Sequence, residues 1–455
     1  MFAGLDEVVQ FLDVFKFNDS HIEYLKKQMP QAEPEFFEWL RGIDSKSLTV
    51  HGIPDGTIVF GKQPLLSIEG PIAIVQLIET PVLNLLNFAT LVCTNASRMN
   101  IKSGEKVKCI EFGLRRAQGP NGALTATKYS FMGGFVGTSN VYAGMLYDIP
   151  ISGTIAHSFI MSFDDETNID SHCHIKGTNV LTRAKEFREE LKWTNTNDSE
   201  LCSFVSFACS YPDKFLALID TFGTIKSGCK NFLCVSLVLS ELGYQPIGIR
   251  LDSGNLAILS QEVRNLFIET GKKYDHDYSK LTIVASDGIN EDKIRQLNAD
   301  DHQIDIFGIG TNLVTCEAQP ALGMVYKLVE IEGKPKIKIS EEKEKVLLPG
   351  RKKVFRVYEN ETPSFDIMLH EDEEDLISAN ELTAYHPFDD GVTVTVKSPT
   401  RIDKLTQKLY ENGQVSFKTK TIHEKRTEVL EQIEVFDHAV VKSDEKTYEV
   451  YLSKK

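Results

Sequence analysis

The sequence contains no uninterrupted apolar run of the roughly 18–20 residues that a transmembrane helix needs. Its first residues, MFAGLDEVVQFLDVF, carry acidic side chains where a secretory signal would carry lysines, and they lack the apolar core of such a signal. The eight cysteines are scattered without a CxxC pair, which indicates reduced thiols. These absences favour a cytosolic protein without a membrane partner.

An excess of positive charge is also missing. Acidic residues outnumber basic residues by 65 to 50, and the net charge is −15. A protein that neutralises nucleic-acid phosphates needs a basic stripe, so we expect no nucleic-acid partner. A small polyanionic substrate remains compatible with this charge if it meets a local basic cluster.

The length of 455 residues exceeds that of one ordinary core. We predict three segments: residues 1–100 with mixed helix and strand patterns, a barrel domain at 101–320, and a β-rich, charged extension with some helix at 321–455. Within the middle segment, helical stretches separate several short β-rich apolar runs, which predicts a parallel sheet. The runs are VKCIEFGLRR, IPISGTIAHS, FLALIDTFGT, PIGIRLDSG, LTIVASDGIN and IDIFGIGTN.

Six such runs in one region favour a closed βα barrel of the TIM type over its alternative, a doubly wound open sheet. In a barrel, the catalytic groups lie in the loops at the C-terminal strand ends. The polar and charged residues of this segment fall at the same places, directly after the apolar runs. We therefore expect functional residues at the ends of these runs.

Two of these run ends carry charged or glycine-rich patterns. Arg250 and Asp252 are separated by one residue, so that both side chains can point the same way. Such a pair can hold an anion together with a metal-bound or hydroxyl-bearing group, and a structural ion pair is the alternative. Gly308 and Gly310 in FGIGTN would let backbone N–H groups approach a phosphate, and a tight turn without a ligand is the alternative.

A basic cluster lies in the glycine-rich stretch 111–140, which contains Arg115, Arg116 and Lys128. Paired arginines among backbone-permissive positions suit an oligophosphate ligand. His157 lies where the apolar segment IPISGTIA becomes polar. A lone histidine there is usually a satisfied rim residue, but its place among phosphate-type loops makes it a candidate.

A second histidine pattern, SHCHIKG, contains His172, Cys173 and His174. Neighbours on an extended segment point to opposite faces. His172 and His174 can share a metal, but the sequence offers no further ligand cluster. We therefore expect no zinc site here.

The sequence resembles the nicotinate phosphoribosyltransferase family. The stretches EFGLRRAQGPNGALTATKYS, GGFVGTSNVYAG, GTIAHSF, GIRLDSG and FGIGTNLVT occur in the order and spacing of that family, and the similarity fades after about residue 400. The resemblance implies an α/β fold: an irregular βα barrel with an α/β sandwich domain built from both chain ends. It also implies a homodimer with active sites at the interface.

The implied reaction converts nicotinate and 5-phosphoribosyl 1-pyrophosphate into nicotinate mononucleotide and pyrophosphate, coupled to ATP hydrolysis. This is the first step from nicotinic acid to NAD, and its enzymes fall in the ligase and glycosyltransferase classes. The pyridine nitrogen needs no general base, so preorganised charge should dominate catalysis. We expect Mg²⁺, or Mn²⁺ in its place, on the pyrophosphate.

The resemblance also implies roles for individual residues. His157 matches the residue that ATP phosphorylates, and a neutral imidazole suits that role near pH 7. Arg250 matches the partner of the nicotinate carboxylate, and Thr154 matches another nicotinate contact. Asp252 matches a position near the ribose hydroxyls and the metal. Residues expected to contact phosphoribosyl pyrophosphate are Arg115, Asp287, Gly308, Gly310 and Thr311.

Ser139 bears on the choice of base. Relatives that use nicotinamide carry an aspartate after the Gly-Thr that is here Gly137-Thr138, and this aspartate accepts from the amide. An aspartate would repel a carboxylate, so Ser139 favours nicotinate and is expected to line its site. Asn255 and Val136 depart from aspartates that are common in the family, which is expected to weaken metal or ribose contacts.

Family members usually carry several tens of residues before the point at which this sequence begins. Those residues include a tyrosine that lies against the pyridine ring across the dimer interface. We expect their loss to expose a sheet edge and to remove one wall of the nicotinate site. The alternatives to an active enzyme are therefore a shortened form that dimerises or binds substrate without turnover, and a relative that uses nicotinamide.

Overall fold

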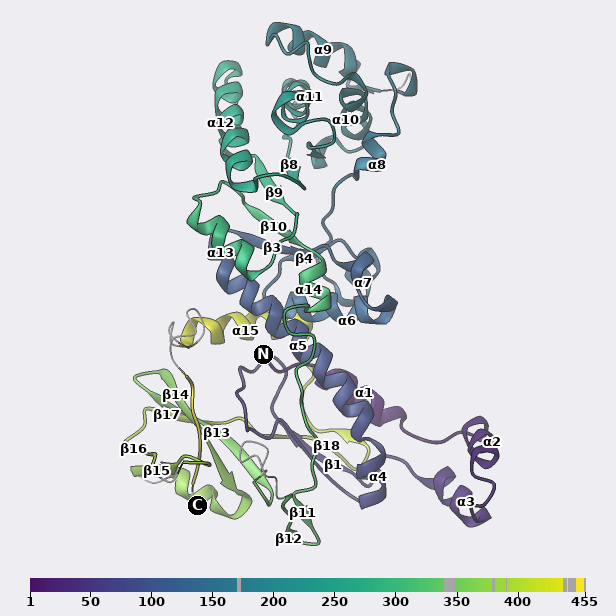
Figure 1. The fold of residues 1–455 in the computed structure, drawn as a ribbon, viewed down its shortest axis with the longest axis vertical. Coiled ribbons are helices and arrows are strands. Elements are labelled where there is room, and N and C mark those ends of the chain that lie inside the picture. Colours follow the sequence, from purple (N-terminus) through teal and green to yellow (C-terminus); the bar gives the residue numbers. More distant parts are fainter. Residues whose placement is uncertain are drawn as a thin grey trace. The chain divides into compact units, whose positions relative to one another are not determined.

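The computed structural model describes residues 1–169, 173–338, 348–378, 381–389, 391–436, 440 and 447–453 (Figure 1). The chain forms two compact units. One consists of Met1–Asn95, Met132–Gly134 and Gln319–Lys455, and the other consists of Ala96–Phe131 and Phe135–Ala318. The first unit is therefore built from both chain ends, as expected for the sandwich domain.

The second unit is organised around a six-stranded parallel sheet. Its strands are β3 (Lys108–Glu111), β4 (Gly137–Thr138), β7 (Leu216–Leu218), β8 (Gly248–Leu251), β9 (Thr282–Ala285) and β10 (Ile306–Ile309). They are hydrogen bonded in the order β4-β3-β10-β9-β8-β7. The last strand in chain order, β10, pairs with the first, β3. This pairing is typical of a barrel, in which the sheet closes on its first strand. A doubly wound sheet instead reverses its strand order at a switch point and leaves the sheet open.

This arrangement confirms the irregular βα barrel, in an incomplete form. Within the described residues the ladder is interrupted between β4 and β7. The run IPISGTIAHS was expected to supply a strand and contributes only a parallel bridge between Ile151 and Thr138. Pro150 has no N–H for a ladder, and residues 150–153 are exposed, so this run lacks the two-sided burial of the other strands.

Helices connect the strands of this unit and cover the sheet. The connecting helices are α6 (Gly119–Met132), α11 (Cys229–Glu241), α12 (Leu256–Tyr274) and α13 (Glu291–Ala299), and α9 (Val180–Glu190) and α10 (Asp198–Ser210) pack on α11. Shorter helices are α7 (Val141–Tyr147), α8 (His157–Ile160) and α14 (Thr311–Thr315), and α5 (Glu79–Ser103) enters this unit with its last turns. Because all six strands are parallel, their C-terminal ends share one edge.

Among the described residues, the first unit contains a four-stranded antiparallel sheet, a six-stranded mixed sheet and a short hairpin of β11 (Glu330–Ile331) and β12 (Lys334–Pro335). The four-stranded sheet has the order β19-β18-β1-β2, with β19 (Gln414–Val415) and β2 (Leu66–Glu69) at its edges. It pairs β1 (Thr49–Gly52) with β18 (Gln407–Glu411) and so joins the two ends of the chain. The larger sheet has the order β16-β15-β20-β14-β13-β17. Its strands are β13 (Lys352–Glu359), β14 (Thr362–His370), β15 (Glu381–Tyr385), β16 (Thr393–Lys397), β17 (Arg401–Lys404) and β20 (Val450–Leu452).

The helices of the first unit pack around these sheets. They are α1 (Leu5–Val14), α2 (Asp19–Gln28), α3 (Pro34–Gly42), α4 (Ile72–Leu77), the larger part of α5, and α15 (Ile422–Val435) among the described residues. The buried ammonium of Lys425 on α15 lies 2.7 Å from Asp6 and 2.9 Å from Asp55. A cation buried to this degree needs such partners, so this triad ties the C-terminal helix to the first residues of the chain.

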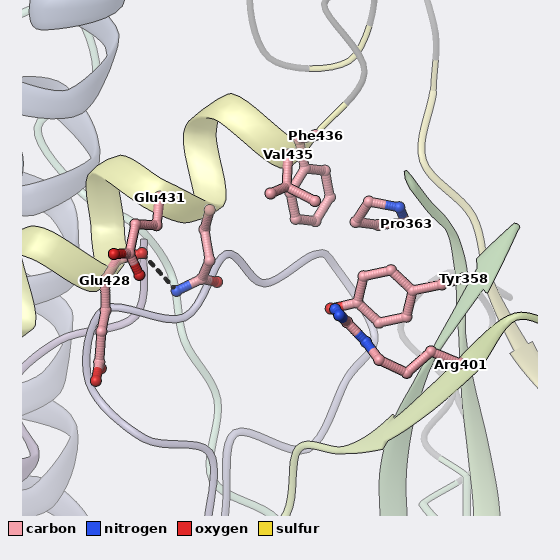
Figure 2. Close-up of a pocket in the computed structure, with 8 residues that line it drawn as sticks. Tyr358, Pro363, Arg401, Glu428, Glu431, Val435 and Phe436 are labelled. Atoms are coloured by element: carbon pink, nitrogen blue, oxygen red, sulfur yellow. Dashed lines mark hydrogen bonds between the residues drawn. The ribbon is translucent and has the colours of Figure 1, made fainter. Parts of the chain in front are cut away.

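A cleft of about 230 Å³ lies beside α15 in the first unit (Figure 2). Its walls include Tyr358, whose ring lies 3.8 Å from the guanidinium of Arg401, and the side chains of Glu428 and Phe436. None of the predicted site residues lines this cleft. The candidate functional residues instead belong to the second unit.

Candidate active site

The loops at the C-terminal edge of the parallel sheet carry most of the residues predicted to be functional. Arg115 follows β3, Ser139 follows β4, Asp252 follows β8, Asp287 follows β9 and Thr311 follows β10. Because these strands run in one direction, the five positions come to the same edge of the sheet. This is the edge at which barrel folds place their catalytic loops.

His157 begins α8 and reaches the end of β7. Its Nδ1 lies 3.0 Å from the hydroxyl of Thr221. Its Nε2 lies 3.8 Å from Oδ1 of Asp220 and 3.7 Å from Oδ2 of Asp252. The side chain is 41% exposed, so the ring is held by neighbours and is still open to a ligand.

Asp220 and Thr221 were not singled out from the sequence. Asp220 is 2% exposed, and its Oδ2 accepts hydrogen bonds from the hydroxyl of Ser253 and from the backbone N–H of Asp252. Its Oδ1 is buried and has no hydrogen-bond partner among the described residues. The available signal was a carboxylate placed directly after the buried strand residues LALI, in the same position as Asp252 after GIRL.

Arg250 lies within β8 and points toward the segment that precedes His157. Its Nη2 donates to the carbonyl oxygen of Ile155 at 3.4 Å, and its buried Nε has no partner among the described residues. Burial lowers the pKa of the Arg250 guanidinium, Asp252 and Asp220 oppose this effect, and Arg115 adds to it. The buried guanidinium of Arg250 therefore has an N–H group, at Nε, that no described residue accepts from, and it lies near the carboxylates of Asp252 and Asp220.

Thr154 lies close to Arg250 through a shared acceptor. The hydroxyl of Thr154 donates to the carbonyl oxygen of Ile155 at 3.1 Å, and this is the same oxygen that receives Arg250. Ser139 is anchored on the neighbouring loop, where its N–H donates to the carbonyl oxygen of Glu111 at 2.9 Å. Thr154 and Arg250 are therefore connected through the carbonyl oxygen of Ile155. Ser139 is fixed by the hydrogen bond of its backbone N–H.

Asp252 is held by the next strand end. Its Oδ1 accepts from the hydroxyl of Ser286 at 2.5 Å, and its Oδ2 faces His157. The interactions of the described residues include no Arg250–Asp252 ion pair, which was the structural alternative for this pair. Asp252 is oriented by Ser286 instead, which leaves one carboxylate oxygen directed toward the imidazole.

The glycine-rich turn after β10 has two different environments. Gly308 is buried, and a Cβ atom there would lie 2.5 Å from the ring of Phe112. This contact gives Gly308 a packing reason that needs no phosphate. Gly310 and the exposed Thr311 lie beyond the strand, where they are accessible, and Arg115 and Asp287 are exposed as well.

A second carboxylate missed from the sequence is Glu111, the last residue of β3. It is 1% exposed and accepts hydrogen bonds from the N–H of Gly113 and from the hydroxyls of Thr127 and Thr138. These donors come from the turn that leads to Arg115, from α6 and from β4. Glu111 therefore fixes the loops that carry Arg115 and Ser139.

The described residues contain no group of three or more histidine, cysteine, aspartate or glutamate side chains that could hold a metal ion. In the SHCHIKG stretch, His172 lies outside the described residues, Cys173 is buried and His174 is exposed at the start of β5 (His174–Ile175). The eight cysteines form no disulfide bonds with one another. Within the part of the chain that the structure describes, no helix is both long and apolar enough to cross a membrane.

Three family models match nearly the whole chain. The nicotinate phosphoribosyltransferase (NAPRTase) N-terminal domain matches residues 1–87, the NAPRTase family domain matches residues 107–218 and 231–371, and the C-terminal domain matches residues 351–455. Among curated proteins, nicotinate phosphoribosyltransferase of Dictyostelium discoideum is 43% identical, covering 95% of this chain and 76% of the relative. That of Caenorhabditis elegans is 44% identical, covering 95% and 80%.

Solved structures give the same relationship. The crystal structure of human nicotinic acid phosphoribosyltransferase matches with a TM-score of 0.88 and 32% identity, covering 100% of this chain and 90% of the human chain. The crystal structure of nicotinate-nucleotide pyrophosphorylase from Pyrococcus furiosus shares the fold, with a TM-score of 0.59 and 22% identity over 93% of this chain and 96% of that chain.

Proposed function

The chain belongs to the nicotinate phosphoribosyltransferase family of transferases, and we propose that it joins nicotinate to the ribosyl group of 5-phosphoribosyl 1-pyrophosphate. The products are nicotinate mononucleotide, which leads to NAD, and pyrophosphate. In the proposed reaction the pyridine nitrogen forms a bond to C1 of the ribose as the bond from C1 to the pyrophosphate oxygen breaks. The leaving group keeps the electron pair of that bond.

The observation that carries this proposal is the contact of Arg250, on β8, with the carbonyl oxygen of Ile155, two residues before His157. The planar guanidinium has a buried Nε without a partner in the described residues, and a carboxylate can accept from such a fork with two oxygens. Thr154 shares the Ile155 carbonyl with Arg250 and lies within reach of the same ligand. We assign the nicotinate site to these two residues together with Ser139.

The phosphoribosyl donor is proposed to bind the outer loops. In this proposal Arg115 supplies positive charge, Thr311 and the backbone of Gly310 supply donors, and the exposed Asp287 contacts the ribose hydroxyls. Gly308 belongs to the same turn and allows it to pack on Phe112. Stabilisation of the positive ribosyl centre and of the leaving pyrophosphate is the main task of such a site.

ATP is proposed as a co-substrate that phosphorylates His157. A nitrogen of the neutral imidazole forms a bond to the γ-phosphorus, and the bond from this phosphorus to the bridging oxygen of ADP breaks. Thr221 orients the ring through Nδ1, and Asp220 and Asp252 face Nε2. The two carboxylates would stabilise the positive charge that develops on the ring as it takes up the phosphoryl group, and they hold the ring in one orientation.

A divalent cation fits this residue set. Mg²⁺ prefers oxygen ligands and is usually bound by one or two carboxylates together with substrate phosphates. Asp252 offers an oxygen on the open side of the site and would hold Mg²⁺, or Mn²⁺, against the phosphates. The ion would screen the phosphate charge, and the protein residues would set its position.

We further propose a homodimer that acts in the cytosol. The exposed apolar face of α7 supports the homodimer, since Val141, Tyr142 and Met145 are 64%, 57% and 70% exposed. The absence of disulfide bonds among the eight cysteines supports a reducing compartment. Light scattering of the purified chain tests the first point, because a monomer at micromolar concentration would contradict it.

A competition assay tests the choice of base. We expect product from nicotinate and little from nicotinamide when both are supplied with phosphoribosyl pyrophosphate, Mg²⁺ and ATP. Ser139→Asp should weaken nicotinate use by repulsion of its carboxylate, and Ser139→Ala is the matched control with no added charge. Equal use of nicotinamide by the unmodified chain would favour the alternative of a nicotinamide-using relative.

A further inference from the structure

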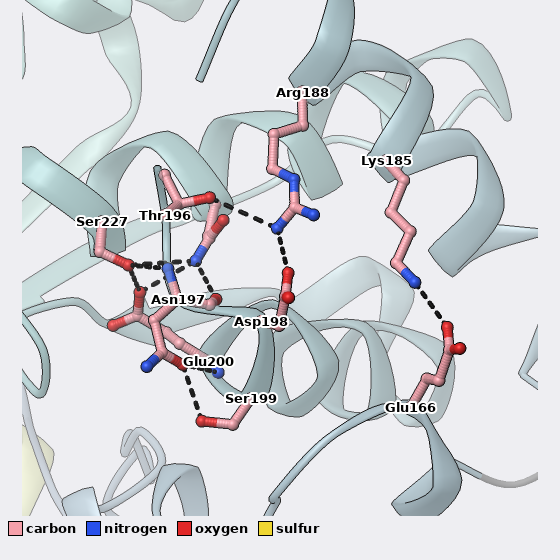
Figure 3. A network of polar contacts seen from close by, with 10 residues as sticks. Glu166, Lys185, Arg188, Thr196, Asn197, Asp198, Ser199, Glu200 and Ser227 are labelled. Atoms are coloured by element: carbon pink, nitrogen blue, oxygen red, sulfur yellow. Dashed lines mark hydrogen bonds and ion pairs between the residues drawn. The ribbon is translucent and has the colours of Figure 1, made fainter. Parts of the chain in front are cut away.

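A fully buried carboxylate, Glu200, lies near the His157 site without contacting the imidazole. Glu200 on α10 is 0% exposed, and Figure 3 shows it at the centre of a polar network. Its Oε2 accepts from the hydroxyl of Ser227 at 2.5 Å and from the side-chain amide of Asn231 at 3.0 Å. Its Oε1 is buried and has no partner among the described residues. No role in the proposed reaction has yet been given to this group.

The partners of Glu200 are Ser227, in the connection between β7 and α11, and Asn231, in the first turn of α11. Ser227 lies in η4 (Thr224–Gly228), a π-helical turn of a kind often found at functional sites. The Ser227 hydroxyl also accepts from the N–H of Asn197 at 2.9 Å, and Asn231 donates to the Asn197 carbonyl at 2.9 Å. The first turn of α10 is thereby fastened to η4.

This turn packs directly on the end of β7. At Gly228 a Cβ atom would lie 1.9 Å from the carbonyl oxygen of Ile219, so the two backbones are in close contact. Ile219 immediately precedes Asp220 and Thr221, the residues that face Nε2 and Nδ1 of His157. A continuous path of contacts therefore runs from Glu200 through Ser227 and Gly228 to the imidazole.

We propose that Glu200 is a positioning residue for His157: through Ser227 it fixes the η4 turn, and this turn fixes Asp220 and Thr221 against the imidazole. The inference rests on the proposed role of His157 as the phosphate acceptor. Glu200 touches neither the imidazole nor a substrate in this arrangement. It acts only through the turn.

A purely structural role explains this carboxylate poorly. Burial raises the pKa of Glu200 to about 7, the hydrogen bonds from Ser227 and Asn231 oppose this effect, and the charge of Asp220 adds to it. A buried acid with an unpartnered oxygen destabilises a fold compared with an apolar side chain of similar volume. Fixing the turn that carries Asp220 gives the network a use that an apolar side chain would not supply.

The test uses the full chain with Ser227→Ala and Glu200→Gln. Ser236→Ala is the matched control. Ser236 lies on α11, is 0% exposed like Glu200, and has a hydroxyl without a partner in the described residues. The first readout is the nuclear magnetic resonance spectrum of labelled histidine side chains without substrates, with the His157 signals assigned from His157→Ala. The second readout is phosphate transfer from labelled ATP, together with kcat and the KM for nicotinate.

We expect Ser227→Ala to displace the His157 signals and to slow phosphate transfer by about tenfold or more, with little change in the KM for nicotinate. Glu200→Gln should act in the same direction, because a neutral amide binds Ser227 more weakly than a carboxylate does. It keeps the size of the side chain and therefore covers the case in which Ser227→Ala does not fold. Ser236→Ala should leave both readouts unchanged.

Unchanged His157 signals in both folded variants would overturn the positioning role. If the unmodified chain takes up no phosphate from ATP, the proposed function of His157 fails, and the histidine spectrum still decides whether Glu200 sets the ring position. Displaced signals that appear equally in Ser236→Ala would show a general effect of core substitution and would also contradict the proposal.

Discussion

Oδ1 of Asp220 lies 3.8 Å from Nε2 of His157, and this carboxylate is almost completely buried while the imidazole is open to solvent. The pair joins the end of β7 to the start of α8. The carboxylate of Asp220 accepts hydrogen bonds from the hydroxyl of Ser253 and the backbone N–H of Asp252, so its position is set by the end of the neighbouring strand β8. His157 is thus a side chain with a defined orientation on a short helix.

The first prediction concerns this pair. Asp220→Asn keeps the shape of the side chain and removes a negative charge facing Nε2 that stabilises the positive charge developing on the ring as it takes up the phosphoryl group. We expect the rate of phosphate transfer from ATP to fall by about 10- to 100-fold, which corresponds to roughly 1.4–3 kcal/mol. Quenched-flow measurement with labelled ATP gives this rate. An unchanged rate in a folded Asp220→Asn variant would remove Asp220 from the account.

Arg250→Lys tests the nicotinate site. Lysine keeps the charge but loses the two-pronged contact with a carboxylate, so the KM for nicotinate should rise by about 10-fold or more. Steady-state kinetics at saturating phosphoribosyl pyrophosphate give this value. Arg295→Lys, at a position 63% exposed on α13, is the control for the substitution itself. A KM that changes equally in both variants would argue against a carboxylate contact at Arg250.

Glu111→Gln should destabilise the second unit. The buried carboxylate accepts from three donors, and a neutral amide satisfies them less well, at a cost of about 1–3 kcal/mol. A lower melting temperature in differential scanning calorimetry is the expected result. Glu105→Gln makes the same change at an exposed position and should leave the melting temperature unchanged. Equal melting temperatures for the two variants would contradict the role of Glu111.

The stability of the chain should depend on pH through Glu200. Its pKa is about 7 in the folded chain and near 4.5 when unfolded, so between these values the folded state binds more protons. Stability contributed by this group is therefore present at low pH and is lost as the pH rises through 7, by up to roughly 3 kcal/mol. The Glu200→Gln variant has no carboxyl group at this position, so its stability should not fall with rising pH for this reason.

Melting temperatures measured from pH 5 to pH 8 check this sign. The variant and the unmodified chain should differ little at pH 5, where Glu200 is protonated, and the variant should become the more stable of the two toward pH 8. A difference that is constant across this range, or that grows toward low pH, would show that the Glu200 carboxyl does not titrate as described.

In the turn after β10, the packing role of Gly308 can be separated from the proposed donor-binding role of Thr311. Gly308→Ala places a methyl group against the ring of Phe112 and should lower the melting temperature. Thr311→Ala changes an exposed side chain and should raise the KM for phosphoribosyl pyrophosphate without lowering the melting temperature. Isothermal titration with the donor and calorimetric melting distinguish the two. The opposite assignment of effects would place the phosphate contact at Gly308.

Local sequence patterns predicted much of the barrel. Buried strands such as β8 and β10 are short apolar runs followed by polar turn residues, and this pattern is visible without tertiary information. The run around Ile151 has the same composition, yet it forms only a bridge, because its burial depends on neighbours that the pattern does not reveal. Strand pairing across the chain ends, such as β1 with β18, is equally invisible locally.

The candidate site was predictable where charged residues stood out from their surroundings. Arg250 and Asp252 combine a charged pattern with a strand end, and His157 gained weight from the family resemblance. Asp220 and Glu111 follow or end strands in the same way but stand alone, without a second charged residue beside them. Their importance comes from hydrogen-bond partners that lie far away in the chain.

The measurement that tests the account most directly is ATP stimulation of nicotinate mononucleotide formation by the purified chain and by His157→Ala, with nicotinate, phosphoribosyl pyrophosphate and Mg²⁺. The account predicts product from the unmodified chain, stimulated by ATP, and loss of that stimulation in His157→Ala. Stimulation that survives in a folded His157→Ala variant, or a chain that forms no product with ATP present, would contradict it.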